Sequence, residues 1–251
     1  MGRKWENIKR TKGKLDSARS AVFVRISREI IVAARQGGGD PAGNYRLRQA
    51  IERARVSGLP NENIARAIRK GTGEDASEAL DEITYEGYGP GGVAVIVEAM
   101  TENRNRTAAD VRAAFNKAGG NMGETGCVGW MFRRVGVVVV PNEDGQHTEE
   151  DLLLLAADAG AEDLRTEDDE IVIECPPEAL EAVTEALNAA SVTVASADVS
   201  LVPANTVMVE DRDVAKKLVK LMNTLDDLDD VQNVTANFDL PEALMAELSH
   251  A

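Results

Sequence analysis

The residues of this chain that could do chemistry gather at its start, between Gly2 and Lys14. This stretch, GRKWENIKRTKGK, is called the basic arm here, and its six basic residues are Arg3, Lys4, Lys9, Arg10, Lys12 and Lys14. Lysine and arginine side chains bind phosphate groups, so the basic arm predicts a polyanionic partner such as a nucleic acid. Trp5 is expected either to stack on a base or, beside Ile8, to seat the arm on the helices that follow.

Charge is segregated along the 251 residues. Residues 1–73 contain 17 Lys+Arg and 6 Asp+Glu, a balance of +11, within a chain whose formal net charge is -15. The other 178 residues contain 11 basic and 37 acidic groups, a balance of -26. A basic head on an acidic body attracts polyanions at one end and repels them elsewhere. The alternative is a solvated basic helical domain that has no ligand.

Side chains for catalysis or metal binding are scarce. The two histidines, His147 and His250, lie in a polar loop and at the C-terminal end, so neither a histidine metal site nor a catalytic triad is expected. The two cysteines, Cys127 and Cys175, lie in unrelated contexts, which argues against a disulfide and suits a reducing cytosol. Cys127 is expected to be a buried small apolar residue rather than a reactive thiol. The sequence therefore predicts no enzymatic activity, no cofactor and no small-molecule substrate.

Two further patterns imitate ligand sites. Gly87–Gly92 satisfies G-x-G-x-x-G, but it leads into the apolar run Val93–Val97, which predicts a hairpin turn rather than a dinucleotide loop. The run Asp226–Asp230 lacks the glycine and distal glutamate of a calcium loop, so a solvated helix end is expected and no metal site. No apolar run approaches the ~18 residues that a membrane helix needs, and a cytoplasmic protein is expected.

Three helices must position the basic residues of the first domain, residues 1–73. The first predicted helix begins at Asp16 or Ser17 and ends at Gln36. The second follows a cap at Asn44. The third runs from Glu62 to Lys70 after a cap at Asn61. The basic side chains expected on their outer faces, in contact with phosphates, are Arg25, Arg28, Arg35, Arg46, Arg48, Arg66, Arg69 and Lys70. Residues 45–57 and 61–70 also allow a helix-turn-helix interpretation, although helical hairpins are common.

After an acidic linker, residues 74–81, the pattern changes to strands. Strands are expected at 83–86, 93–99 and 128–132, with a helix at 107–118. Residues 135–203 then follow the β-α-β-β-α-β order of a ferredoxin-like domain. A strand at 206–209, a helix at 211–225 and a strand at 231–238 complete the interrupted domain. The predicted fold class is α+β, with a three-helix domain, a split α+β domain (82–134 plus 205–240) and an inserted ferredoxin-like domain.

The junction before the 107–118 helix is unusually polar. Its residues are Asn103, Arg104, Asn105, Arg106 and Thr107, and Thr107 is the predicted helix cap. The arginines beside a helix N-terminus could contact a phosphate or an acidic partner. The alternative is that these side chains only tie the loop down.

Taken together, these stretches resemble the YebC family. The matching segments are WENIK (5–9), IIVAAR (30–35), GGGDP (37–41), ARAIRKGTG (65–73), YEGYGPGG (85–92), NRNRT (103–107) and WMF (130–132). The resemblance implies a cytoplasmic three-domain protein without enzymatic activity. It also implies either a DNA-binding transcriptional regulator or, as for a mitochondrial translational activator in the family, a factor that acts on the ribosome and relieves stalling at proline-rich sequences.

The start of the chain bears on that choice. Many members begin Gly-His-Ser-Lys-Trp, whereas this chain begins Gly2-Arg3-Lys4-Trp5 after its methionine. That start resembles a second branch, for which binding of ribosomal or transfer RNA is the more natural expectation. The sequence thus predicts a non-enzymatic nucleic-acid-binding regulator of gene expression, with DNA or the ribosome as its target. A protein-interaction scaffold is the third alternative.

Overall fold

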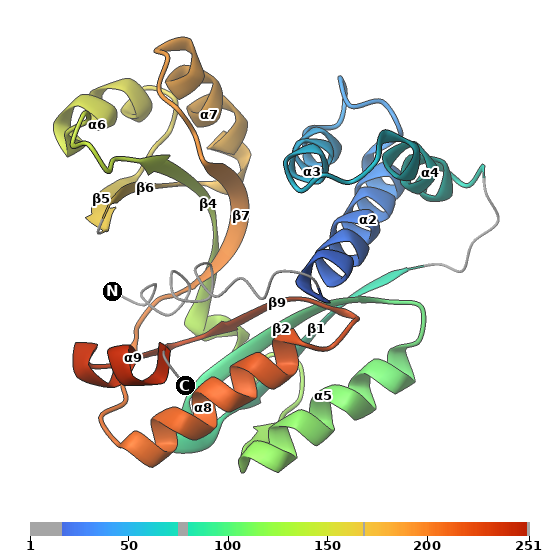
Figure 1. The fold of residues 1–251 in the computed structure, drawn as a ribbon, viewed down its shortest axis with the longest axis vertical. Coiled ribbons are helices and arrows are strands. Elements are labelled where there is room, and N and C mark those ends of the chain that lie inside the picture. Colours follow the sequence, from blue (N-terminus) through green and yellow to red (C-terminus); the bar gives the residue numbers. More distant parts are fainter. Residues whose placement is uncertain (1–16, 75–79, 168, 250–251) are drawn as a thin grey trace. The chain divides into compact units, whose positions relative to one another are not determined.

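The computed structural model describes residues 17–74, 80–167 and 169–249 (Figure 1). The basic arm, including Trp5, lies outside the described residues. The chain divides into two units, one formed by residues 1–132 and 203–251 and the other by residues 133–202. The first unit contains a helical domain and a split α+β domain, and the fold class is α+β as predicted.

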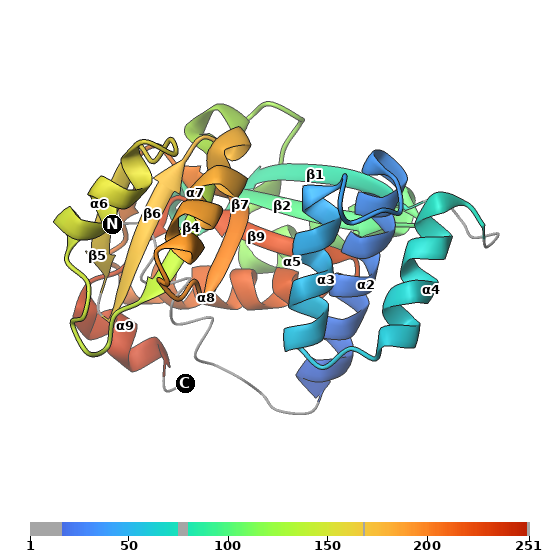
Figure 2. The same cartoon turned by 90° about the horizontal axis from the view of Figure 1, so that it is seen from above.

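The helical domain is built from α2 (Ser17–Gly37), α3 (Tyr45–Val56) and α4 (Asn61–Thr72), which Figure 2 shows from above. Its core consists of small and branched side chains, with Ile30, Leu47, Ala50 and Ala54 fully buried. Asn44 caps α3 as predicted, because its side chain accepts a hydrogen bond from Leu47 N.

The predicted cap at Asn61 is wrong. Pro60 is the N-cap of α4 and provides no side-chain hydrogen bond, so Asn61 is already the first helical residue. The Pro60 carbonyl accepts from the backbone N–H groups of Asn63 and Ile64, which starts the helix without a polar side chain. At the other end, α4 stops at Gly73, whose φ of 82° belongs to the left-handed region.

A glycine inside α4 allows it to approach α2. A Cβ atom at Gly71 would lie 2.5 Å from the Ile31 carbonyl oxygen and 2.6 Å from the Ala34 Cβ atom. Neither contact could be relieved by turning a flexible side chain, because one atom is backbone and the other is a Cβ. Gly71 therefore sets the separation of the two helices.

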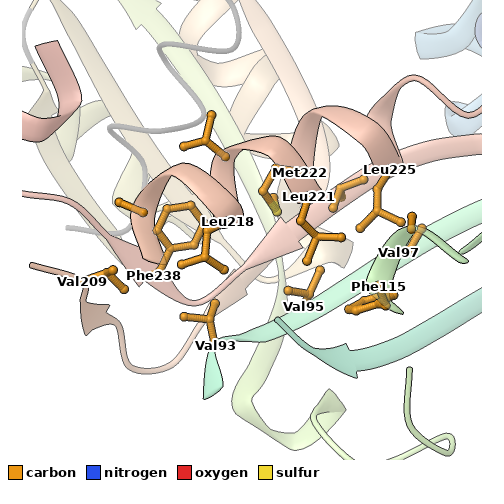
Figure 3. Close-up of a cluster of buried hydrophobic side chains, with 14 of the residues drawn as sticks. Val93, Val95, Val97, Phe115, Val209, Leu218, Leu221, Met222, Leu225 and Phe238 are labelled. Carbon is orange, nitrogen blue, oxygen red and sulfur yellow. The ribbon is translucent and has the colours of Figure 1, made fainter. Parts of the chain in front are cut away.

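The split domain has a sheet of strand order β3-β1-β2-β9. Its strands are β1 (Asp81–Tyr88), β2 (Ala94–Thr101), β3 (Asn121–Met122) and β9 (Val231–Ala236). Helices α5 (Arg104–Ala118) and α8 (Arg212–Asp226) pack on one face of it. Figure 3 shows the resulting core, in which Leu218 and Leu221 of α8 lie over Val95 of β2. Residues separated by more than 100 positions in the sequence therefore share one hydrophobic core.

Two predicted strands of this domain are wrong in detail. Gly129–Met131 forms a 3-10 turn, and the strand begins only at Phe132. The second half of the domain places β8 (Val207–Met208) beside β10 (Phe238–Asp239) in a separate parallel pair, outside the main sheet. At Asn237, between β9 and β10, the backbone carbonyl accepts from Val207 N, and the side-chain oxygen accepts from Ala94 N at 2.8 Å. A short helix, α9 (Glu242–Ser249), packs against α8.

The second unit has the predicted β-α-β-β-α-β order. Its elements are β4 (Phe132–Pro141), α6 (Glu149–Ala157), β5 (Asp163–Glu167), β6 (Glu170–Cys175), α7 (Leu180–Ala189) and β7 (Ser196–Pro203). The sheet order β5-β6-β4-β7 and the antiparallel pairing of β4 with β6 are those of a ferredoxin-like domain. The last strand begins at Ser196 rather than Val192, because Val192 N still bonds to the Leu187 carbonyl at the end of α7.

The close approach at Gly71 generates the first prediction. Gly71→Ala should lower the free energy of unfolding of the helical domain by about 1–3 kcal/mol, although alanine favours helices, because α4 must move away from α2. Urea denaturation followed by circular dichroism measures the change. Gly43→Ala is the matched control, since a Cβ there meets nothing within 4 Å, and it should change stability by less than about 0.5 kcal/mol. Equal stability of the two variants would contradict the packing argument.

Candidate nucleic-acid interface

The three arginines expected on the outer face of α2 all contact other segments of the first unit. Arg25 forms an ion pair with Asp226 at 3.5 Å and donates to the Asp226 carbonyl. Arg28 donates to the Asp229 carbonyl at 2.5 Å, and Arg35 donates to the Leu80 carbonyl at 3.1 Å. These guanidinium groups are occupied within the protein. The apolar stripe on α2 had indicated correctly which face is buried in the helical core, but it could not reveal that the arginine face meets a second domain.

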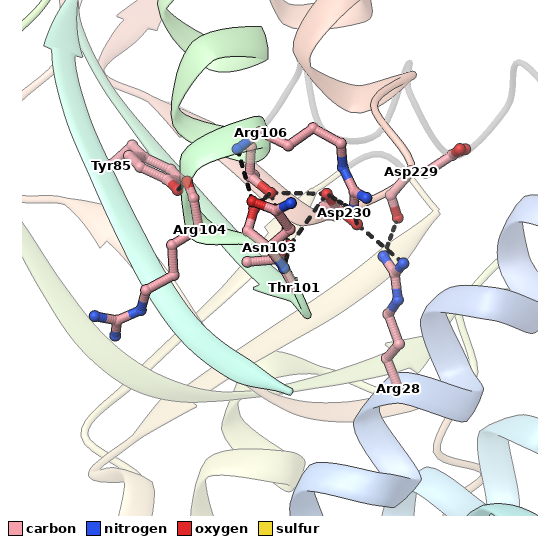
Figure 4. A network of polar contacts seen from close by, with 9 residues as sticks. Arg28, Tyr85, Thr101, Asn103, Arg104, Arg106, Asp229 and Asp230 are labelled. Carbon is pink, nitrogen blue, oxygen red and sulfur yellow. Dashed lines mark hydrogen bonds and ion pairs between the residues drawn. The ribbon is translucent and has the colours of Figure 1, made fainter. Parts of the chain in front are cut away.

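Asp230 is the centre of this contact (Figure 4). Arg28 lies 2.9 Å from its Oδ1 atom and Arg106 lies 2.9 Å from its Oδ2 atom. The Thr107 hydroxyl donates to Oδ2 at 2.7 Å. The Asp230 side chain is only 7% exposed, so the predicted solvated helix end is wrong at this residue. Two cations and a hydroxyl explain how the carboxylate tolerates burial.

The surroundings of Asp230 determine its protonation. Burial alone would raise the pKa of this carboxyl, but the hydrogen bonds from Arg106 and Thr107 and the charges of Arg28 and Arg106 outweigh it. The pKa of Asp230 is therefore lowered from its ordinary value. The folded protein releases this proton more readily than the unfolded chain does, so the carboxylate stabilises the fold above about pH 4.

Two basic side chains expected on the second helix are also engaged. Arg46 pairs with Glu82 at 2.7 Å and donates to Gln36, which itself donates to Glu82. Arg48 donates to the Pro41 carbonyl at 2.8 Å and lies over the Tyr45 ring. Both arginines therefore help to hold α3 against neighbouring segments.

Helix α4 places the remaining predicted cations outward. Arg66 and Arg69 are exposed and Lys70 is half-buried. Asn61 and Asn63, which the helix-turn-helix interpretation aims at a major groove, are also exposed. Glu62 shares this face, and its carboxylate lies 3.5 Å from Arg66. The α4 face, defined here as Arg66, Arg69 and Lys70, is thus open to solvent at two of its three side chains.

Side chains of the polar junction, residues 103–107, make contacts that hold the loop. Asn103, not Thr107, is the helix cap, because its side chain accepts from Arg106 N at 3.1 Å. Thr107 is buried in the first turn against Asp230, and Arg106 pairs with the same carboxylate. Arg104 pairs with Asp81 at 2.9 Å, and Asn105 is exposed. The predicted cap lies one helical turn C-terminal to the observed one, because the polar run extends into the helix.

The glycine-rich stretch is a hairpin turn, as predicted. It joins β1 to the antiparallel strand β2, and Gly91 and Gly92 have φ values of 73° and 74°. Gly87 is required for another reason, because a Cβ there would lie 2.6 Å from the Asn121 carbonyl oxygen. The glycines therefore serve a turn and the close crossing of β3, not a phosphate.

Glu86 is a buried residue whose role the sequence did not predict. Its carboxylate accepts from the backbone N–H groups of Gly126, Val128 and Gly129, at 2.8, 2.8 and 2.6 Å. Burial would raise its pKa, but these three hydrogen bonds outweigh burial and lower it. Glu86 thus fixes the segment Gly123–Met131, called the tryptophan loop here. The only signal in the sequence was a lone acid amid glycine and tyrosine on a strand.

The cysteines offer no activated thiol. Cys127 is half-buried rather than fully buried, and burial followed by the Glu86 charge raises its pKa. Burial raises the pKa of Cys175 to about 11. Residues 17–74, 80–167 and 169–249 contain no cluster of three histidine, cysteine, aspartate or glutamate side chains placed to hold a metal. No helix in these ranges is both long and apolar enough to span a membrane.

Asp230 generates the second prediction. Asp230→Asn should lower the free energy of unfolding by about 3 kcal/mol at pH 7, because it leaves Arg28 and Arg106 without their shared counter-charge. Stability of the natural protein should fall as the pH drops below about 4, and the variant should lose part of that dependence. Urea denaturation at pH 7 and pH 3.5 measures both effects.

The neighbouring aspartate provides the control. Asp227 belongs to the same acidic run but is exposed. Asp227→Asn should change stability by less than about 0.5 kcal/mol and should keep the acid sensitivity of the natural protein. Similar losses in both variants would mean that net charge, rather than the Asp230 contacts, stabilises this junction.

Comparisons with known proteins find matches over nearly the whole chain. Residues 3–74 match the TACO1/YebC protein N-terminal domain, and residues 80–238 match the TACO1/YebC second and third domain. A "probable transcriptional regulatory protein" of Thermosynechococcus vestitus is 52% identical over 245 residues, covering 96% of each chain. A protein with the same description from Symbiobacterium thermophilum is 52% identical, covering 97% of this chain and 100% of that relative.

A solved structure shares the fold. The crystal structure of a conserved hypothetical protein from Aquifex aeolicus superposes with a TM-score of 0.83 at 47% sequence identity, and it covers 91% of this chain and 93% of that one. The two family models, the relatives and the solved structure all identify the same family, and together they cover nearly the whole chain. The chain is a member of the TACO1/YebC family.

Proposed function

We propose that this protein is a non-enzymatic regulator of gene expression that binds nucleic acid through its basic head. The observation that carries the proposal is the segregation of charge, +11 over residues 1–73 against -26 over the rest. Relatives at 52% identity are named probable transcriptional regulatory proteins, which supports DNA as the partner. Phosphate contacts would release counterions, so the affinity should fall steeply as salt rises.

The contacts of the arginines indicate which basic residues could bind phosphates. Arg25, Arg28, Arg35, Arg46 and Arg48 have protein partners, so they are better assigned to the fold. We assign the proposed phosphate-binding surface to the basic arm and to the α4 face, where Arg66 and Arg69 are exposed. Glu62 on α4 pairs with Arg66, so a phosphate bound here would replace this carboxylate as the partner of Arg66.

A ribosomal target is the second candidate, favoured by the start of the chain. Gly2-Arg3-Lys4-Trp5 departs from the Gly-His-Ser-Lys-Trp start found in many members of the family. The basic arm would then bind ribosomal or transfer RNA, again through phosphates, which are common to RNA and DNA. A pull-down from cell extract, with and without nuclease, distinguishes the targets by whether genomic DNA or ribosomal RNA is recovered.

The α4 face generates the third prediction. Replacing Arg66, Arg69 and Lys70 by Glu should weaken binding to a DNA duplex at least about tenfold. It should also reduce the slope of log affinity against log salt, by about 0.9 for each DNA phosphate that the variant no longer neutralises. Fluorescence anisotropy with a labelled duplex measures both quantities.

A charge-matched control lies on the acidic body. Lys117, Lys217 and Lys220 are exposed, and replacing them by Glu changes the net charge by the same amount. This control should bind within about threefold of the natural protein if the site is local. Equal weakening by both triple variants would contradict an α4 interface and indicate a response to net charge alone.

The basic arm generates the fourth prediction. Replacing Lys9, Arg10, Lys12 and Lys14 by Glu should abolish co-sedimentation with 50S or 70S ribosomal particles, if the ribosome is the target, because the arm would then repel RNA phosphates. Sucrose-gradient sedimentation at low and moderate salt measures it. If the variant sediments like the natural protein, the ribosomal candidate fails. Binding of any partner that ignores these reversals would favour the scaffold alternative.

A further inference from the structure

Two aromatic side chains are exposed on the split domain of a protein that has few aromatics. The whole sequence contains 2 Trp, 3 Tyr and 4 Phe. Trp130, in the tryptophan loop, is 74% exposed, and Tyr88, at the end of β1, is 36% exposed. Tryptophan side chains are usually well buried, so the exposure of Trp130 in a tightly hydrogen-bonded loop calls for a functional explanation.

Both rings are held by their polar edges. The Tyr88 hydroxyl donates to the Cys127 carbonyl at 3.1 Å, and Trp130 Nε1 donates to the same carbonyl at 3.3 Å. The Cys127 carbonyl is itself positioned by Glu86, which binds the N–H groups of Gly126 and Val128 on either side. The rings therefore have fixed anchoring points, while the faces of Trp130 remain accessible.

The surroundings fit a planar ligand better than an apolar protein surface. Tyr88 and Trp130 are the exposed large hydrophobic side chains of residues 80–132, and Val207 and Met208 on β8 are the other two in the split domain. The exposed residues next to them in the loop are Glu124, Thr125 and Gly126. A protein-docking surface has an apolar centre of several side chains, which this segment does not provide. A nucleobase needs only a ring face on which to stack.

We propose that Trp130, supported by Tyr88, stacks on an unpaired base of the bound nucleic acid. This inference rests on the proposed function and narrows it, because base faces are accessible in single strands, loops and bulges but hidden within a duplex. Stacking releases no counterions, so this contact adds affinity that is independent of the salt-sensitive phosphate contacts. The partner class is therefore a nucleic acid with single-stranded segments.

Tryptophan fluorescence tests the inference directly. Trp5→Phe leaves Trp130 as the single tryptophan of the chain. Its emission should be quenched by a single-stranded oligouridine of about 15 nucleotides, and much less by a duplex of equal length, because only the former offers free base faces.

Substitutions at the ring provide the second measurement. Trp130→Ala should weaken binding of the oligouridine about tenfold without changing its salt slope, and Trp130→Phe should stay within about threefold of the natural protein. Val56→Ala is the matched control, since Val56 is also an exposed apolar residue, 90% accessible, and it should bind normally. Circular dichroism confirms that each variant is folded.

The outcomes separate this inference from the proposed function. Unchanged Trp130 emission while anisotropy reports binding, or an unchanged affinity of Trp130→Ala, overturns the inference and leaves nucleic-acid binding in place. Quenching by a proline-rich peptide but not by oligouridine also overturns it, in favour of a peptide site. If neither oligouridine nor duplex binds the natural protein at low salt, the proposed function fails as well.

Discussion

The ion pairs at Asp230 are the interaction on which the first unit depends. A buried carboxylate is costly unless cations and hydrogen bonds surround it, and here Arg28 arrives from the helical domain while Arg106 and Thr107 arrive from α5. Asp230 itself immediately precedes β9, so one side chain joins three segments that are distant in the sequence. The apolar contact of Val32 with Leu80 and Met100 adds to this junction.

The contacts at Asp230 change the interpretation of the positive charge in residues 1–73, the basic head. Arg25, Arg28 and Arg46 pair with acids of the first unit outside the helical domain, so the +11 balance overstates the charge available to a ligand. The acidic residues Asp226, Asp230 and Glu82 correspondingly help to hold the helical domain. The α4 face differs because the Arg66 and Arg69 side chains on it are exposed.

The split domain contains a second buried carboxylate, and backbone N–H groups are its hydrogen-bond donors. Glu86 satisfies three N–H groups of the tryptophan loop, which has no regular secondary structure beyond the 3-10 turn at Gly129–Met131. Such a loop needs a buried acceptor because the amides of Gly126, Val128 and Gly129 bond to this carboxylate and not to a strand or helix. The same carboxylate thereby determines where Trp130 is displayed.

The sequence by itself determined the α+β class, the order of the elements, the hairpin at Gly91-Gly92 and the cap at Asn44, because periodicity, turn residues and caps act over a few neighbouring positions. It could not decide which arginines face the split domain, since a guanidinium on a helix face looks the same whether it meets phosphate or Asp230. It also missed the pairing of β8 with β10, the burial of Glu86 and the exposure of Trp130. The strand pairing and the burial of Glu86 depend on partners more than 25 residues away, which only the tertiary structure brings together.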